Sequence, residues 1–175
     1  TSATLPLAFH EARAAGKEFK HSHDWPRGTA FEAPDVADDA LRDGETARRA
    51  ADFLRARAAA QDGPFFLAVG FYQPHLPFVA PKKYFDLYDP AKLPLAPAGD
   101  TPAAMPAVAS NGSGELRAQY REVPAKGPIP EPLARQLLHG YLACVSYVDA
   151  QMGRVLEELD RLGLSDNTIV IFASD

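Results

Sequence analysis

Apolar side chains recur every three or four residues in two parts of the chain, which predicts two helices. The first covers residues 43–60, and its apolar face consists of small alanines and one leucine: Ala47, Ala50, Ala51, Leu54 and Ala58. Asp43 is suited to the N-cap of this helix. The small side chains on the apolar face of the helix favour close packing on a sheet. The second helix covers residues 131–162 and ends before Gly163.

Two other segments are apolar at consecutive positions. Residues 65–72 (Phe-Phe-Leu-Ala-Val-Gly-Phe-Tyr) and residues 168–173 (Thr-Ile-Val-Ile-Phe-Ala) do not alternate between polar and apolar side chains. A strand that is covered on both faces has this character, as in the centre of a parallel sheet. We therefore predict two central strands, one before and one after the second helix.

The connection between the first of these strands and the second helix holds most of the 16 prolines of the chain. Because proline has no backbone N–H, we expect mostly loop here, with one short helix over residues 82–88. Residues 1–42 show no clear period and are expected to be irregular. Residues 43–175 then follow the order helix, strand, long loop, helix, strand. This order favours a layered α/β fold in which helices flank a mostly parallel central sheet.

Composition and charge narrow the class of partner. The formal net charge is -5, and no cluster of basic residues is longer than the pair Lys82 and Lys83, so nucleic-acid binding is not expected. The apolar runs are far shorter than the roughly 20 residues that span a bilayer, so no membrane span is expected either. The single cysteine, Cys144, lies among apolar residues of the second helix, where we expect it to be a small buried hydrophobe.

Two residues with suitable chemistry each follow one of the predicted strands. His75 comes three residues after Tyr72, and Asp175 comes two residues after Ala173. If the strands are parallel, both side chains lie at the same edge of the sheet, where α/β folds bind their ligands. Each also has a structural interpretation, because such a histidine is more often an ordinary loop residue and such an aspartate often caps the next helix. Prolines on both sides of His75 restrict its backbone and favour the functional interpretation.

Longer motifs resemble one known family. The segment Pro-Phe-Phe-Leu-Ala-Val-Gly-Phe-Tyr-Gln-Pro-His-Leu-Pro-Phe at residues 64–78 resembles the sulfatase segment in which a strand delivers a Pro-His pair to the active site. The similarity extends over residues 35–44, 81–88, 141–156 and 168–175, and is strongest to iduronate-2-sulfatase-like members. The resemblance implies the alkaline-phosphatase-like α/β fold and the hydrolysis of a sulfate ester, such as a sulfated saccharide or a small-molecule ester. It also implies a periplasmic or secreted protein.

The resemblance implies roles for individual residues. His75 would be a catalytic residue that hydrogen-bonds the sulfate, and Asp175 would be one ligand of a Ca²⁺ ion, which prefers hard oxygen ligands. Gln73 would contact the substrate, at a position where relatives often carry lysine or arginine. Sulfatases convert a cysteine in a Cys-x-Pro-Ser-Arg motif to formylglycine, and Cys144 is not in that setting. We therefore expect residues 1–175 to be an internal part of a catalytic domain, with its nucleophile upstream and no turnover of its own.

Two alternatives to a sulfatase stay open. A sister hydrolase of the same superfamily would act on phosphate or phosphonate esters, with threonine or serine as its nucleophile. A non-catalytic binding protein that kept the fold is the other alternative. Whichever holds, two central strands without their neighbours would expose unpaired edges, so self-association of the isolated chain is expected.

Overall fold

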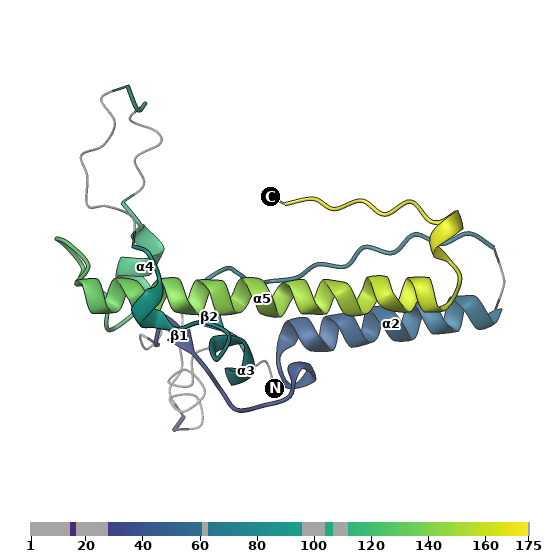
Figure 1. Ribbon diagram of the computed structural model, residues 1–175, viewed down its shortest axis with the longest axis horizontal. Coiled ribbons are helices and arrows are strands. Elements are labelled where there is room, and N and C mark those ends of the chain that lie inside the picture. Colours follow the sequence, from purple (N-terminus) through teal and green to yellow (C-terminus); the bar gives the residue numbers. More distant parts are fainter. Residues whose placement is uncertain (1–14, 17–27, 61–62, 96–103, 107–111, 175) are drawn as a thin grey trace.

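The computed structural model describes residues 15–16, 28–60, 63–95, 104–106 and 112–174. A long helix, α5, forms its axis, and helix α2 lies alongside it (Figure 1). The elements in chain order are β1 (Phe31–Glu32), the 3-10 turn η2 (Asp38–Ala40), α2 (Arg42–Ala60), β2 (Phe78–Val79), α3 (Lys82–Phe85), η3 (Pro90–Lys92), α4 (Gly114–Gln119), α5 (Glu131–Arg161) and η5 (Ser165–Asn167). None of the described helices combines the length and the apolar character that a membrane span requires.

Both predicted long helices are confirmed, but their packing differs from the expectation. The alanine-rich face of α2 is buried against α5 rather than against a sheet. Helix α2 begins at Arg42, so Asp43 lies inside its first turn and the predicted N-cap is wrong. Its carboxylate instead accepts hydrogen bonds from the backbone of residues 72 and 73, a contact that no local pattern reveals. The short helix expected over residues 82–88 is present as α3.

A glycine in the middle of α5 lets this helix approach the only sheet in the described residues. Strands β1 and β2 are parallel, with Phe31 opposite Phe78. A Cβ atom added to Gly140 would lie 3.0 Å from the Cβ atoms of both phenylalanines. The small sheet therefore rests directly on the helix. Two apolar clusters lie on either side of this contact: Leu41, Ala80, Tyr84, Phe85, Ala143, Cys144 and Tyr147 in one, and Ala30, Tyr120, Val123 and Leu137 in the other.

Neither of the two predicted central strands forms a strand in this structure. Residues 65–72 and 168–173 have no assigned secondary structure, and Figure 1 draws both as long runs that return along α5 in the same direction. Several of their apolar side chains are almost fully exposed, among them Phe66 (91%) and Ile169 (90%). A central strand takes its backbone hydrogen bonds from neighbouring strands, and the described residues supply no neighbouring strand for these segments. The apolar pattern therefore predicts a burial that this part of the chain does not provide.

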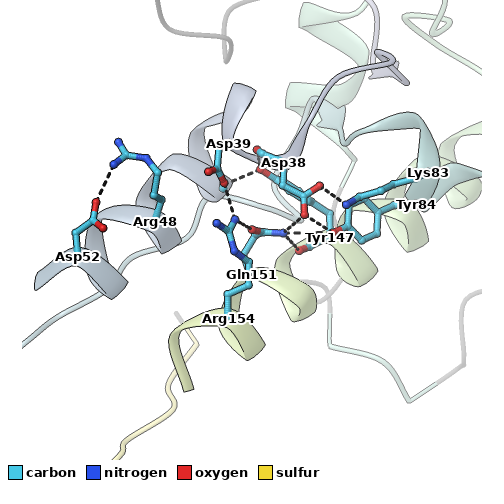
Figure 2. A network of polar contacts seen from close by, with 10 residues as sticks. Asp38, Asp39, Arg48, Asp52, Lys83, Tyr84, Tyr147, Gln151 and Arg154 are labelled. Carbon is cyan, nitrogen blue, oxygen red and sulfur yellow. Dashed lines mark hydrogen bonds and ion pairs between the residues drawn. The ribbon is translucent and has the colours of Figure 1, made fainter. Parts of the chain in front are cut away.

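A polar network fixes the turn that precedes α2, as Figure 2 shows. The Asp38 carboxylate accepts hydrogen bonds from the Tyr84 hydroxyl at 2.8 Å and from Gln151 Nε2 at 3.1 Å, and it lies 2.7 Å from Lys83 Nζ. Partial burial raises the pKa of Asp38, but these hydrogen bonds lower it by more, so it stays below its ordinary value. Arg154 of α5 pairs with the neighbouring Asp39 at 2.6 Å. The residues just before α2 are thus tied to both α3 and α5.

An ion-pair cluster at the other end of the two helices predicts a pH-dependent contribution to stability. Hydrogen bonds and charge from Arg161, and then from Arg55 of α2, outweigh the opposing effect of burial and lower the pKa of Glu158 to about 2. A lowered pKa contributes stability above the ordinary glutamate range, and this contribution is lost as the pH falls toward about 2. Glu158→Gln should therefore reduce Tm slightly near neutral pH and have no effect in strong acid. Thermal unfolding of both proteins across this pH range checks the prediction, and a Tm difference independent of pH would contradict it.

Candidate functional site

His75 lies in a short loop, residues 72–77, that is stabilised by hydrogen bonds between its own residues; we call it the braced loop. The Tyr72 hydroxyl donates to the Leu76 carbonyl oxygen at 2.7 Å, and Gln73 Nε2 donates to the Pro77 carbonyl oxygen at 3.2 Å. The backbone N–H of His75 donates to the Tyr72 carbonyl oxygen at 3.1 Å. The loop between residues 72 and 77 is therefore closed by three internal hydrogen bonds. These bonds give the imidazole a defined backbone position without any contribution from a neighbouring strand.

The hydrogen bond of the ring fixes which nitrogen carries a proton. His75 Nδ1 lies 2.7 Å from the Leu76 carbonyl oxygen, which can only accept, so Nδ1 is the donor. In the neutral ring Nε2 is then an acceptor, and it donates only when the ring is protonated. The side chain is 55% exposed, and Nε2 lies 3.8 Å from the Glu115 carboxylate of α4. The imidazole is thus more than half exposed, and its Nε2 atom lies beside a negative charge.

The ring of Tyr72 packs against the imidazole of His75. Its ring centroid lies 5.0 Å from that of His75, and the Arg42 guanidinium lies 5.1 Å from the Tyr72 ring centroid. Burial raises the pKa of Tyr72, the charge of Glu115 raises it further, and Arg42 opposes both. The phenol therefore keeps its proton, which it donates to the Leu76 carbonyl oxygen.

A buried carboxylate holds the beginning of the loop. Asp43 is 2% exposed, and its two oxygens accept the backbone N–H groups of Tyr72 at 2.9 Å and Gln73 at 2.8 Å. Sequence patterns assign Asp43 to a helix cap and miss this contact.

The structure places the other predicted substrate contact, Gln73, differently from His75. Its side-chain amide turns back toward its own loop, where Nε2 bonds to the Pro77 carbonyl oxygen. Its Oε1 atom is buried and has no hydrogen-bond partner among the described residues. A buried acceptor of this kind is costly unless a donor reaches it. The substrate-binding role of Gln73 stays a prediction.

The described residues do not form a calcium site by themselves. No group of three or more His, Cys, Asp or Glu side chains in this part of the chain is arranged to hold a metal ion. The predicted ligand Asp175 lies outside the described residues. Because Ca²⁺ takes six to eight oxygen ligands, one carboxylate from this chain would have to be joined by others from elsewhere.

Cys144 has the buried role that its position predicts. It is completely buried between α5 and its neighbours, and burial raises the pKa of its thiol. A thiol that keeps its proton in an apolar site is a poor nucleophile. Cys144 is therefore a core residue and plays no chemical part.

Comparison with known proteins supports one family. A family model described as "Sulfatase" matches residues 9–175. The chain is 39% identical over 147 residues to the iduronate 2-sulfatase of Homo sapiens, a match that covers 81% of the chain and 26% of that protein. It is 35% identical to an arylsulfatase of Clostridium perfringens, over 71% of the chain and 24% of the relative. It is also 33% identical to a multifunctional alkaline phosphatase superfamily protein of Trinickia caryophylli, over 73% of the chain and 25% of the relative.

The chain spans about a quarter of the length of these relatives. The family model, however, matches nearly the whole chain, including the braced loop of His75 and both long helices. We conclude that the chain belongs to the sulfatase family.

Proposed function

We propose that this chain is an internal part of a sulfuric ester hydrolase and that His75 is its contribution to the chemistry. The observation that carries the proposal is the hydrogen-bonded loop of residues 72–77, which holds a half-exposed imidazole by its Nδ1 atom and leaves Nε2 as the second nitrogen for a substrate. A surface histidine without a function needs no such arrangement. Family membership supplies the reaction class, and the loop supplies a suitable residue.

The tautomer of His75 defines what this residue does for a sulfate ester. When the ring is protonated, Nε2–H donates a hydrogen bond to the ester oxygen. As the S–O bond breaks, this proton passes to the departing alcohol oxygen and the ring becomes neutral, which is general acid catalysis. Before that step, the same donor stabilises negative charge on the sulfate oxygens. The neutral ring carries no proton at Nε2, so only the protonated ring acts in this way.

The remaining parts of the site are expected from other segments of the protein. A formylglycine upstream of this chain would supply the nucleophile, and Ca²⁺ held by Asp175 with further ligands would neutralise sulfate charge. We propose a sulfated saccharide or a related sulfate ester as the substrate. Because Gln73 carries no charge, recognition of a uronate carboxylate at this position is not expected.

The full-length protein is expected to hydrolyse an aryl sulfate, whereas residues 1–175 alone are expected to have no turnover because the nucleophile is missing. Both are assayed with the same chromogenic sulfate, with and without chelator. Hydrolysis by the isolated chain that a chelator abolishes would contradict the proposal.

Sedimentation of the same chain tests its self-association, which the exposed apolar segment 168–173 favours. A monomer at all concentrations would contradict that part.

One relative favours a second candidate function. The protein of Trinickia caryophylli is described as a multifunctional member of the alkaline phosphatase superfamily, so hydrolysis of phosphate or phosphonate esters is the alternative. The two candidates differ in the upstream nucleophile, cysteine for sulfate and threonine or serine for phosphate. Parallel assays of the full-length protein with aryl sulfate, aryl phosphate and phosphonate esters distinguish them.

A further inference from the structure

The carboxylate of Asp43 connects the core of the protein to the loop of His75. It lies in the first turn of α2 and is 2% exposed. Its two oxygens accept the N–H groups of two consecutive residues, Tyr72 and Gln73, which lie three and two residues before His75. Two bonds from one carboxylate to adjacent peptide groups fix both the position and the orientation of the chain there.

Asp43 itself is held rigidly. The N–H group of the next residue, Gly44, donates to the Tyr147 hydroxyl of α5 at 2.7 Å, and this hydroxyl donates to the Asp38 carbonyl oxygen at 3.0 Å. The first turn of α2 is thereby tied to α5 and to the turn before it. A displacement of Asp43 would break contacts on both sides, so the carboxylate is a fixed point for the loop.

The energetics favour a role beyond local packing. A buried carboxylate is costly unless charge-assisted hydrogen bonds compensate for its lost hydration, and here two backbone donors do so. An apolar side chain at position 43 would avoid that cost but would leave the N–H groups of Tyr72 and Gln73 without this acceptor. The carboxylate instead accepts hydrogen bonds at the point where the segment 65–72 ends and the braced loop begins.

We propose that Asp43 is a positioning residue for His75: it anchors the backbone at residues 72 and 73 so that Nε2 meets the sulfate ester in a productive geometry. The proposal rests on the sulfatase function proposed above. It assigns Asp43 no contact with the substrate. Its effect on the rate passes entirely through the imidazole.

A double-mutant cycle in the full-length protein tests this dependence, with an aryl sulfate as substrate. Asp43→Asn keeps one acceptor oxygen but turns an NH₂ group toward the second backbone N–H. It should lower kcat by about 10²-fold and change KM little, because a misplacement of about 1 Å costs this much. In the His75→Ala background the same substitution should lower kcat by less than about 2-fold, since nothing is left to position.

The control for general destabilisation is Glu158→Gln, which also breaks a contact between α2 and α5 but lies away from the loop. It should leave the kcat of the folded enzyme unchanged. If Asp43→Asn lowers the rate by the same factor with and without His75, Asp43 acts only on folding and the proposal is overturned. Should Asp43→Asn not fold, Asp43→Glu replaces it in the cycle, because Glu keeps both oxygens and the charge while shifting them by one methylene.

Amide hydrogen exchange gives a readout that needs no sulfatase activity. Asp43→Asn should raise the exchange rate at Tyr72 and Gln73, while exchange inside α5 stays as in the unmodified protein. Unchanged exchange at these two amides would overturn the anchoring role. If the unmodified protein hydrolyses no sulfate ester, but Asp43→Asn still raises exchange at these two amides, only the proposed function is refuted and the anchoring role stands.

Discussion

His75→Ala is expected to lower kcat for an aryl sulfate by about 10²–10⁴-fold in the full-length protein, the range that general acid catalysis contributes. The reason is the Nε2 atom of the half-exposed imidazole, which we propose as the donor to the departing oxygen. KM should change much less, because the proton is transferred in the transition state. Steady-state kinetics of the unmodified protein and of the variant measure both effects.

The matched control for this experiment is His139→Gln. The His139 ring lies within α5, and its Nε2 bonds to the Phe85 carbonyl oxygen at 2.8 Å. Glutamine can still donate to that oxygen, so the control should keep its activity. If His75→Ala is as active as His139→Gln, His75 has no chemical role and the proposed function loses its main support.

Gly44→Ala is expected to cause the largest loss of stability of any small substitution considered. A Cβ atom at this position would lie 2.0 Å from the Asp38 carbonyl oxygen and 2.4 Å from its carbonyl carbon. Because both are backbone atoms, the turn before α2 must move, which costs about 1–3 kcal/mol or more. Such a movement also disturbs the hydrogen bond between Gly44 and Tyr147. Denaturant unfolding of the full-length protein measures the change.

Gly153→Ala is the control, because nothing lies within 4 Å of the Cβ atom that it would add to α5. This substitution should stabilise the helix by up to about 1 kcal/mol. Opposite signs for the two substitutions are therefore expected. Equal stability of the two variants would contradict the close approach at Gly44.

The helices and the fold class could be predicted from the sequence, because an apolar face repeats along each helix and the motifs are specific. Helix α5 extends over Glu131–Arg161, within one residue of the prediction. Membership of the sulfatase family confirms the α/β fold of the alkaline phosphatase superfamily, of which this chain shows the helices and a small parallel sheet. The two central strands could not be confirmed in the same way, since strand pairing depends on neighbours elsewhere in the sheet.

The candidate site was only partly accessible to sequence analysis. His75 stands out because prolines flank it and because a long motif surrounds it. Asp43 does not, because its two hydrogen bonds join residues about thirty positions apart and leave no periodic trace. The hydrogen bond from the Tyr72 hydroxyl to the Leu76 carbonyl oxygen also leaves no periodic trace in the sequence, because it depends on how the backbone turns between these residues. Asp175 lies outside the described residues, so its metal-binding role stays a prediction.

The most direct measurement is a crystal structure of the full-length protein with sulfate bound. We predict that residues 65–72 and 168–173 form parallel strands of one sheet in the full-length protein. His75 Nε2 should lie within hydrogen-bond distance of a sulfate oxygen, and Asp175 should lie at the same edge of the sheet. Placement of the His75 and Asp175 side chains at opposite ends of the sheet would contradict this prediction.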